Sequence, residues 1–289
     1  MKKLVILIFS FIICLFLTPA AWAIKIGLYT DCNDSIYVGV SKGGVIQNVQ
    51  TSAYILILNQ MKPYKIKKQG NYILITFDKK DYRISAKEIM IKSTRNDGLV
   101  YIKKRWYKGN LTILNTQKGL TVINDVDMES YIKGVVPAEM PVGWNTEAHK
   151  AQAIAARSYA VANSGKRLSY GYDLKDTPVD QNYMGVSIES AKTNKAVEST
   201  SGQVLTYDGN IIPAYYHASA GGKTLSAKKV WGKDLPYIKS VNSFDRNVKR
   251  NGHRVGMSQH GANVLASRGY NAYQILGYFY KNVSLRKLY

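Results

Sequence analysis

The chain has 289 residues, of which 46% are apolar, and its formal net charge is +21. This length and apolar fraction are typical of a packed globular protein with one large or two smaller domains, and they exclude a disordered chain. The excess of positive charge indicates a polyanionic surface or partner, or else a composition that is simply rich in lysine.

The N-terminus has the pattern of a signal peptide. Two lysines precede an apolar run from Leu4 to Leu17, which contains one serine, Ser10, and Ala21-Trp22-Ala23 fits a small-x-small cleavage site. The run is shorter than the roughly 20 apolar residues that cross a bilayer. We therefore expect residues 1–23 to be a signal peptide, with a retained membrane anchor as the alternative. Export would place the protein in the periplasm, the cell wall or the extracellular space.

Export also bears on cysteine chemistry and on the anionic partner. Cys14 would leave with the signal peptide, so Cys32 would be the lone thiol and no internal disulfide could form. The polyanions met outside the membrane are cell-wall glycopeptide, its attached acidic polymers and lipid head groups. We therefore expect cell-wall glycan rather than nucleic acid as the partner.

The region from Ile24 to about Lys108 has the pattern of a β-rich unit. Short runs rich in Ile, Val, Tyr and Thr are separated by Gly, Asn, Asp or Lys. These runs predict strands at 24–30, 35–40, 44–50, 54–60, 71–77, 81–86, 98–107 and 110–116. We assign residues 24–105 to this N-terminal region.

Helical patterns begin after this region. Residues 128–136 predict a short helix that ends at Pro137, because the residue before a proline avoids the α conformation. The clearest helix is predicted at 146–163, with Asn145 as its N-terminal cap and Ser164-Gly165 at its end.

Further elements are predicted towards the C-terminus. Residues 187–200 predict a helix that ends at Gly202, and 202–222 predict a hairpin around Asp208-Gly209-Asn210. Two more helices are expected, near 262–267 and 272–282. Helices and strands mix without a βαβ rhythm, so the sequence predicts an α+β fold.

One acid stands in unusual surroundings. In "GVVPAEMP", Glu139 lies between two prolines and among apolar residues, where an ionised carboxylate is poorly solvated. Such surroundings should raise its pKa, so that it could hold a proton near neutral pH and transfer it. The alternative is a structural glutamate satisfied by Arg157 or by backbone amides.

Four segments resemble the SpoIID/LytB family of bacterial cell-wall proteins, and they come in the family's order. They are residues 122–163, which include the "EMP" motif, then "YYHASAGGKT", "VWGKDLPYI" and "GHRVGMSQHGA". The resemblance covers about residues 106–289, which we assign to a mixed α+β domain of this type. The last segment departs from the family's usual "GHGVGMSQYGA" at Arg254 and His260.

The resemblance implies one of two activities. The family includes lytic transglycosylases, which cleave peptidoglycan glycan strands, and amidase enhancers, which assist a separate cell-wall amidase. In the transglycosylases the acid of "EMP" is catalytic, so the resemblance assigns that role to Glu139. A single carboxylate would suffice, because the sugar's own 6-hydroxyl attacks and leaves a 1,6-anhydro-muramic acid end. Asp125 and Asp180 stay open as second carboxylates.

The resemblance also implies substrate-binding residues. They lie on the predicted helix, in the "YYHASAGGKT" loop and in the "GHRVGMSQHGA" loop: Gln152, Arg157, Tyr216, His217, Ser219, Lys223, His253, Ser258 and Gln259. For each of them a purely structural role is the alternative. Some family members bind zinc through His and Cys near these loops. Here the loop has no cysteine, so we expect neither a metal nor another cofactor. The oligomeric state is left open.

Overall fold

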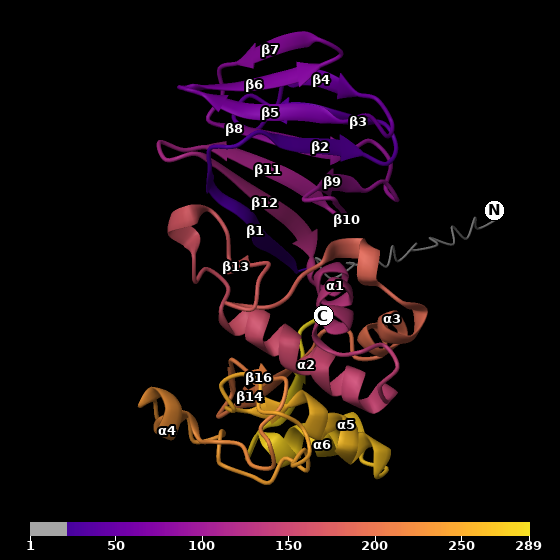
Figure 1. Ribbon diagram of the computed structural model, residues 1–289, viewed down its shortest axis with the longest axis vertical. Helices are drawn as coiled ribbons and strands as arrows, with labels where there is room; N and C mark the ends of the chain where they lie inside the picture. Colours follow the sequence, from indigo (N-terminus) through magenta and orange to yellow (C-terminus); the bar gives the residue numbers. More distant parts are fainter. Residues whose placement is uncertain (1–21) are drawn as a thin grey trace, which may run out of the picture.

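The structure is a computed structural model that describes residues 22–289 (Figure 1). Residues 1–21, which make up most of the expected signal peptide, lie outside the described residues. Within residues 22–289, no helix combines the length and the apolar character needed to cross a membrane. The α+β fold predicted from the sequence is confirmed, because β-sheets fill one half of the molecule and helices the other.

A seven-stranded sheet joins the two halves. Its strand order is β13-β1-β12-β11-β8-β3-β4. The bounds are β1 Ala23–Cys32, β3 Gly44–Asn48, β4 Tyr54–Leu58, β8 Glu88–Ser93, β11 Asn110–Asn115, β12 Leu120–Asp127 and β13 Leu174–Lys175. Strands from both sides of the expected boundary after residue 105 share this sheet, and the division into two regions stays a prediction.

A six-stranded sheet packs against the first. Its order is β10-β9-β2-β5-β6-β7. The bounds are β2 Ile36–Val40, β5 Tyr64–Gln69, β6 Tyr72–Phe77, β7 Lys80–Ile84, β9 Val100–Ile102 and β10 Arg105–Tyr107. Alternate side chains of both sheets, such as Ile46 and Ile66, are fully buried in one shared core. Burial of one face of each sheet fixes the register of its strands.

The sequence patterns missed four of these strands, β5, β8, β12 and β13, and merged two others. Strands β5 and β8 contain lysines on their exposed sides, as in "YKIKKQ", and these charges hid the alternation of buried Tyr64 and Ile66. The single strand predicted at 98–107 is instead the hairpin β9–β10, which turns at Lys103 and Lys104 in the left-handed region.

The first helix is longer than predicted. Helix α1 spans Met128–Glu139 and is capped by the Asp127 side chain, which accepts a hydrogen bond from the Ser130 amide at 2.9 Å. The prediction that it ends before Pro137 is wrong. Pro137 lies in the last turn, where its missing N–H removes one helical bond only, and Met140 then adopts an extended conformation before Pro141.

Helix α2, Thr146–Ala162, is the element that links the two cores. Its cap is Asn145, as predicted, and Figure 1 shows it lying between the sheets and the C-terminal helices. On one side Ala148 and Ala155 belong to a core shared with helices α5 and α6, and on the other side Ala153 and Ala160 belong to the core of the sheets. Alanines let the neighbouring backbones approach on both sides.

The remaining elements surround this helix. The predicted hairpin is β14 Gln203–Tyr207 with β15 Asn210–Ile211, and β18, Ser284–Lys287, adds an unpredicted third strand. The other helices are α3 Ala191–Glu198, α4 Ala227–Trp231, α5 Gln259–Ser267 and α6 Ala272–Phe279, with short strands β16 Tyr216–His217 and β17 Met257–Ser258. Helix α5 begins three residues before its predicted start because the Ser258 side chain caps it.

Candidate active site

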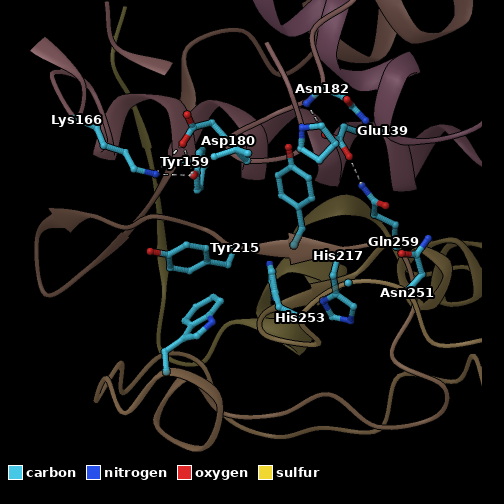
Figure 2. Close-up of a pocket in the computed structure, with 16 residues that line it drawn as sticks. Glu139, Tyr159, Lys166, Asp180, Asn182, Tyr215, His217, Asn251, His253 and Gln259 are labelled. Carbon is cyan, nitrogen blue, oxygen red and sulfur yellow. Dashed lines mark hydrogen bonds and ion pairs between the residues drawn. The ribbon is translucent and has the colours of Figure 1, made fainter. Parts of the chain in front are cut away.

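Glu139 is the last residue of helix α1 and points into a cavity of about 440 Å³ (Figure 2). One carboxylate oxygen, Oε1, accepts a hydrogen bond from the Asn182 amide at 2.9 Å, and Oε2 accepts one from Nε2 of Gln259 at 3.1 Å. Both donors are neutral. Among residues 22–289 Glu139 has no ion pair, so neither Arg157 nor another cation holds it in the charged form.

Burial raises the pKa of the Glu139 carboxyl, which is the direction that its apolar sequence surroundings predict. The hydrogen bonds from Asn182 and Gln259 and the nearby Tyr216 hydroxyl act in the opposite direction but do not outweigh burial. The position at the C-terminal end of a helix also disfavours negative charge. The site therefore favours a carboxyl that carries a proton.

Aromatic rings form one wall of the cavity. The rings of Tyr215 and Trp231 meet edge to face with centroids 4.7 Å apart, and Tyr159 meets Tyr215 at 5.7 Å. His253 lies 5.0 Å from Trp231. Such a wall offers flat apolar faces beside polar groups, which suits the alternating C–H faces and hydroxyl edges of a sugar.

Two histidines line the same cavity in their neutral forms. Burial lowers the pKa of His217 to about 4, and the neighbouring His253 adds to this shift. Burial lowers the pKa of His253 as well. Nδ1 of His217 lies 3.2 Å from the Val255 carbonyl, whereas its Nε2 is buried and has no hydrogen-bond partner among residues 22–289. A buried polar atom without a partner is uncommon, and here it belongs to a residue that lines the cavity.

Asp180 lines the opposite end of the cavity but is already engaged. Its fully buried carboxylate pairs with Lys166 at 2.7 Å and with Nε of Arg167 at 2.8 Å. Burial opposes the charge, yet these hydrogen bonds prevail and lower the pKa of Asp180. Asp125, the other candidate for a second carboxylate, is on strand β12 and does not line the cavity.

A second acid, Asp245, organises the loops behind the histidines. Its carboxylate accepts hydrogen bonds from the backbone amides of Ala220 and Gly222, both at 2.7 Å, from Ser258 Oγ at 2.7 Å, and from Ser243. Two of the predicted substrate-binding residues serve this framework instead. Ser258 caps helix α5, and buried Ser219 donates to the Lys249 carbonyl.

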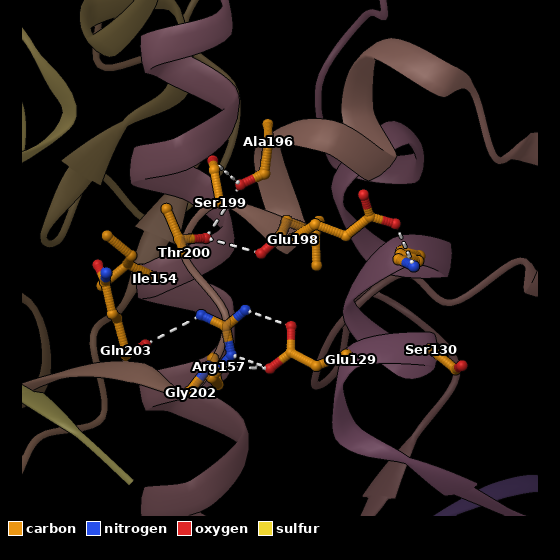
Figure 3. Close-up of polar contacts among 12 residues, drawn as sticks. Glu129, Ser130, Ile154, Arg157, Ala196, Glu198, Ser199, Thr200, Gly202 and Gln203 are labelled. Carbon is orange, nitrogen blue, oxygen red and sulfur yellow. Dashed lines mark hydrogen bonds and ion pairs between the residues drawn. The ribbon is translucent and has the colours of Figure 1, made fainter. Parts of the chain in front are cut away.

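Arg157 lies away from the cavity, fully buried between helices α1 and α2 (Figure 3). Its guanidinium donates to both carboxylate oxygens of Glu129, at 2.8 and 2.7 Å, and to the Gln203 carbonyl at 2.9 Å. The hydroxyl of Tyr289, the last residue, donates to the same carboxylate at 2.5 Å. Arg157 therefore has no exposed surface with which to touch a substrate or orient Glu139.

Of the other residues predicted to bind the substrate, four line the cavity and two do not. Tyr216, His217, His253 and Gln259 line the cavity with Glu139. Gln152 is fully buried in helix α2, and neither polar atom of its side chain has a partner in the described part of the chain, residues 22–289. Lys223 is exposed, and neither residue lines the cavity. Within residues 22–289, no cluster of three His, Cys, Asp or Glu side chains could hold a metal ion.

The sequence patterns missed several residues of the cavity. Asn182, Tyr215, Trp231 and Asn251 line it, and they come from four separate segments of the chain. Tyr215 lies in the segment "YYHASAGGKT" and Trp231 in "VWGKDLPYI". The family resemblance indicated these segments as a whole but did not single out either residue. Asn182 acts through its backbone amide, so no side-chain pattern could have indicated it.

Comparison with known proteins agrees with this geometry. The family model named stage II sporulation protein, SpoIID, matches residues 116–207, a range that contains Glu139. The chain is similar to that family over this range. It is 45% identical over 107 residues to the amidase enhancer of Bacillus subtilis (strain 168), a match that covers 37% of this chain and 14% of that protein.

Two further members of the comparison are somewhat less similar. The stage II sporulation protein D of Bacillus subtilis (strain 168) is 36% identical over 136 residues, 42% of this chain and 40% of that protein. An uncharacterized protein of Brachyspira hyodysenteriae is 36% identical over 144 residues, 50% of this chain and 39% of that protein. This chain thus spans less than half the length of each of these relatives.

Proposed function

We propose that this protein is exported and acts as a lytic transglycosylase on the glycan strands of peptidoglycan, with Glu139 as its single acid and base. The observation that carries the proposal is the state of Glu139. This carboxyl faces a cavity, its pKa is raised by burial, and neutral donors hold its two oxygens. A group in this state is suited to give a proton to a glycosidic oxygen.

The two donors give Glu139 a fixed direction without fixing its charge. A cation partner would stabilise the carboxylate and lower its pKa, as happens to Asp180. The Asn182 amide and the Gln259 side chain instead orient the oxygens, while burial raises the pKa and so favours the protonated form. When the proton leaves for the glycosidic oxygen, these same donors solvate the carboxylate that forms.

The proposed reaction then needs no second free carboxylate. The 6-hydroxyl of the muramic acid attacks the anomeric carbon, its proton passes to ionised Glu139, and a 1,6-anhydro end forms. Water is not consumed. Hydrolysis would require a second acid as base or nucleophile. Asp180, which lines the same cavity, is occupied by Lys166 and Arg167, which supports the route with one carboxylate.

The cavity wall supports a sugar as the substrate. Tyr215, Trp231 and Tyr159 offer ring faces and edges within one cavity. The unpartnered Nε2 of His217 provides a neutral polar contact for a hydroxyl or an acetamide group. A neutral histidine adds no positive charge near Glu139, whereas a charged one would favour the ionised carboxylate and lower its pKa.

A second function is favoured by one comparison. The relative that is 45% identical is named amidase enhancer, so this chain is a candidate to bind the cell wall and assist a separate amidase without cutting glycan itself. In that case Glu139 would contribute to binding rather than to bond cleavage.

The test is digestion of purified glycan strands with the wild type and with Glu139→Gln, followed by mass spectrometry of the ends. The proposal expects 1,6-anhydro-muramic acid ends from the wild type and almost none from the variant. Anhydro ends made by Glu139→Gln at an undiminished rate would remove Glu139 from the mechanism.

A second assay separates the two functions. Purified wild-type protein is added to a cell-wall amidase acting on sacculi, and amidase turnover is measured with and without Glu139→Gln. Intact glycan strands together with raised amidase turnover, kept in the variant, would establish the enhancer function instead.

A further inference from the structure

The outer face of the six-stranded sheet carries a band of aromatic and basic side chains. Because side chains alternate along strands, those that point away from the core are fixed by the register. On strands β10, β9 and β2, Trp106 lies opposite Tyr101, which lies opposite Gly39. Two residues before Gly39 on the same face, Tyr37 lies opposite Lys65. Three aromatic rings thus stand on adjoining strands of one exposed face.

This face is hollowed beside the aromatic residues. A groove of about 330 Å³ is lined by Tyr101 and Trp106 on one side and by Met61, Lys62 and Pro63 on the other, with Gly39 between them. Gly39 has no side chain, and a Cβ there would lie 3.0 Å from the Lys62 carbonyl, so the glycine keeps the floor of the groove open. The groove shares no lining residue with the cavity at Glu139.

The aromatic residues of this face are accessible to different degrees: Tyr37 is exposed, and Tyr101 and Trp106 are half-buried. The exposed fraction of Tyr37 is 54% and that of Met61 is 61%. The rings of Tyr101 and Trp106 contact each other at 5.1 Å with an angle of 57° between their planes. This contact fixes the two rings at the side of the groove, so their exposed surfaces are already positioned for a ligand.

Positive charge surrounds these rings. Lys65 and Lys67 are exposed on strand β5, Arg83 is exposed on β7, and Lys62 lines the groove. On the same face the register places one carboxylate, Asp81, opposite Thr76. Such a face would attract an anionic chain, and ring surfaces beside cations suit sugars that carry acidic groups.

We propose that this face, defined by Tyr37, Tyr101, Trp106, Lys62, Lys65 and Lys67, is a second binding site for a glycan strand that bears carboxylates. Sugar rings would pack on the three aromatic residues, and the lysines would pair with the acidic groups along the strand. The choice of glycan rests on the proposed function, since peptidoglycan carries such carboxylates on its lactyl and peptide groups. The site would hold the polymer while the cavity at Glu139 acts on it.

The test measures binding alone, in the uncleaving background Glu139→Gln. Purified glycan strands that retain their peptides are titrated into this protein at low salt and the dissociation constant is measured by calorimetry. Adding Tyr37→Ala should weaken binding about fivefold to tenfold, and adding Lys65→Ser with Lys67→Ser should weaken it by a similar factor that disappears at high salt. These residues are exposed, so the variants should fold normally, as circular dichroism can verify.

Matched controls lie elsewhere on the surface. Tyr54→Ala removes a tyrosine that is 69% exposed on strand β4, and Lys233→Ser with Lys239→Ser removes two exposed lysines outside the face. Neither control should change the affinity. Equal affinity in all variants, or equally tight binding of duplex DNA or anionic lipid vesicles by the same face, would overturn the proposal.

The two proposals fail separately. If the face variants bind normally while Glu139→Gln abolishes cleavage, the second site is refuted and the proposed function stands. If the face variants lose binding while Glu139→Gln still cleaves glycan, the second site stands and the proposed role of Glu139 in cleavage is refuted.

Discussion

Helix α1 carries a glutamate near each end, and the two experience opposite surroundings. Glu129 lies in the first turn, beside the positive end of the helix, and pairs with the buried guanidinium of Arg157. Glu139 lies at the negative end, and within residues 22–289 it accepts hydrogen bonds from neutral donors only. Burial acts against the charge in both cases, but the pKa of Glu129 is lowered and that of Glu139 is raised.

The comparison shows that a single helix can hold one acid for structure and one for chemistry. Burial alone does not decide between these roles, because both acids are partly buried. What differs is the partner: a cation fixes the charge of Glu129, whereas Glu139 can gain and lose a proton.

The largest effect is expected from Glu139→Gln. Loss of a general acid should lower the rate of glycan cleavage by about 10²–10⁴-fold. The midpoint of urea unfolding should change little, because the Gln259 side chain can turn its amide oxygen towards the new NH2 group while the Asn182 amide keeps its acceptor. The assay is anhydro-end formation per unit time. A variant that loses stability and activity together would mean that Glu139, like Glu129, serves the fold.

The next largest effect is expected from Arg157→Met, and it concerns stability. Removing the cation leaves Glu129 partly buried without its partner, which should cost about 3 kcal/mol of unfolding free energy at pH 7. Adding Glu129→Gln should restore part of this loss. Urea unfolding of the single and double variants measures the coupling.

The pH dependence of the Arg157→Met effect has a definite sign. The folded-state pKa of Glu129 lies below the ordinary value of 4.5, so its stabilising contribution is present above that value and is lost as pH falls through the lower pKa. The difference in unfolding free energy between the wild type and Arg157→Met should therefore become smaller as the pH falls. A difference that stays constant down to pH 2 would contradict this ion pair.

A smaller effect is expected from Asp245→Asn. The carboxylate accepts four hydrogen bonds, and an asparagine has one acceptor oxygen and an NH2 group that would face donors. The unfolding free energy should fall by about 2 kcal/mol, and KM should rise because the loops of His217 and Gln259 lose their support. Asp234→Asn, at an exposed position, is the control and should change neither quantity.

The smallest effect is expected from His217→Asn. His217 is neutral above about pH 5 because its pKa is about 4, so it does not titrate near neutrality. The cleavage rate should fall as pH rises through the raised pKa of Glu139, and the midpoint of that fall should be the same in wild type and variant. Only the affinity for glycan should decrease. A shifted midpoint would show that His217 takes part in the proton transfer.

The sequence predicted some features well because they depend on near neighbours. Helix α2 and its Asn145 cap follow from spacing and from one side chain, and both were found as expected. The raised pKa of Glu139 followed from the apolar residues beside it. Local chemistry was enough in both cases.

Other features depend on partners that are distant in the chain. From the sequence, Arg157 was a candidate partner of Glu139, which is eighteen residues away. In the structure Arg157 instead forms an ion pair with Glu129, in the first turn of helix α1. Pro137 was expected to end that helix, yet a proline in the last turn breaks too few hydrogen bonds to do so. The role of Asp245 could not be predicted from the sequence, because the four groups that donate hydrogen bonds to it come from three separate segments.

The most direct test of the contrast is to titrate the two carboxyls. Glutamate labelled with ¹³C at the side-chain carboxyl, assigned through Glu129→Gln and Glu139→Gln, reports each pKa by NMR. We expect Glu139 to titrate above the ordinary value of 4.5 and Glu129 below it. A Glu139 pKa at or below 4.5 would contradict the claim that this carboxyl holds a proton for transfer.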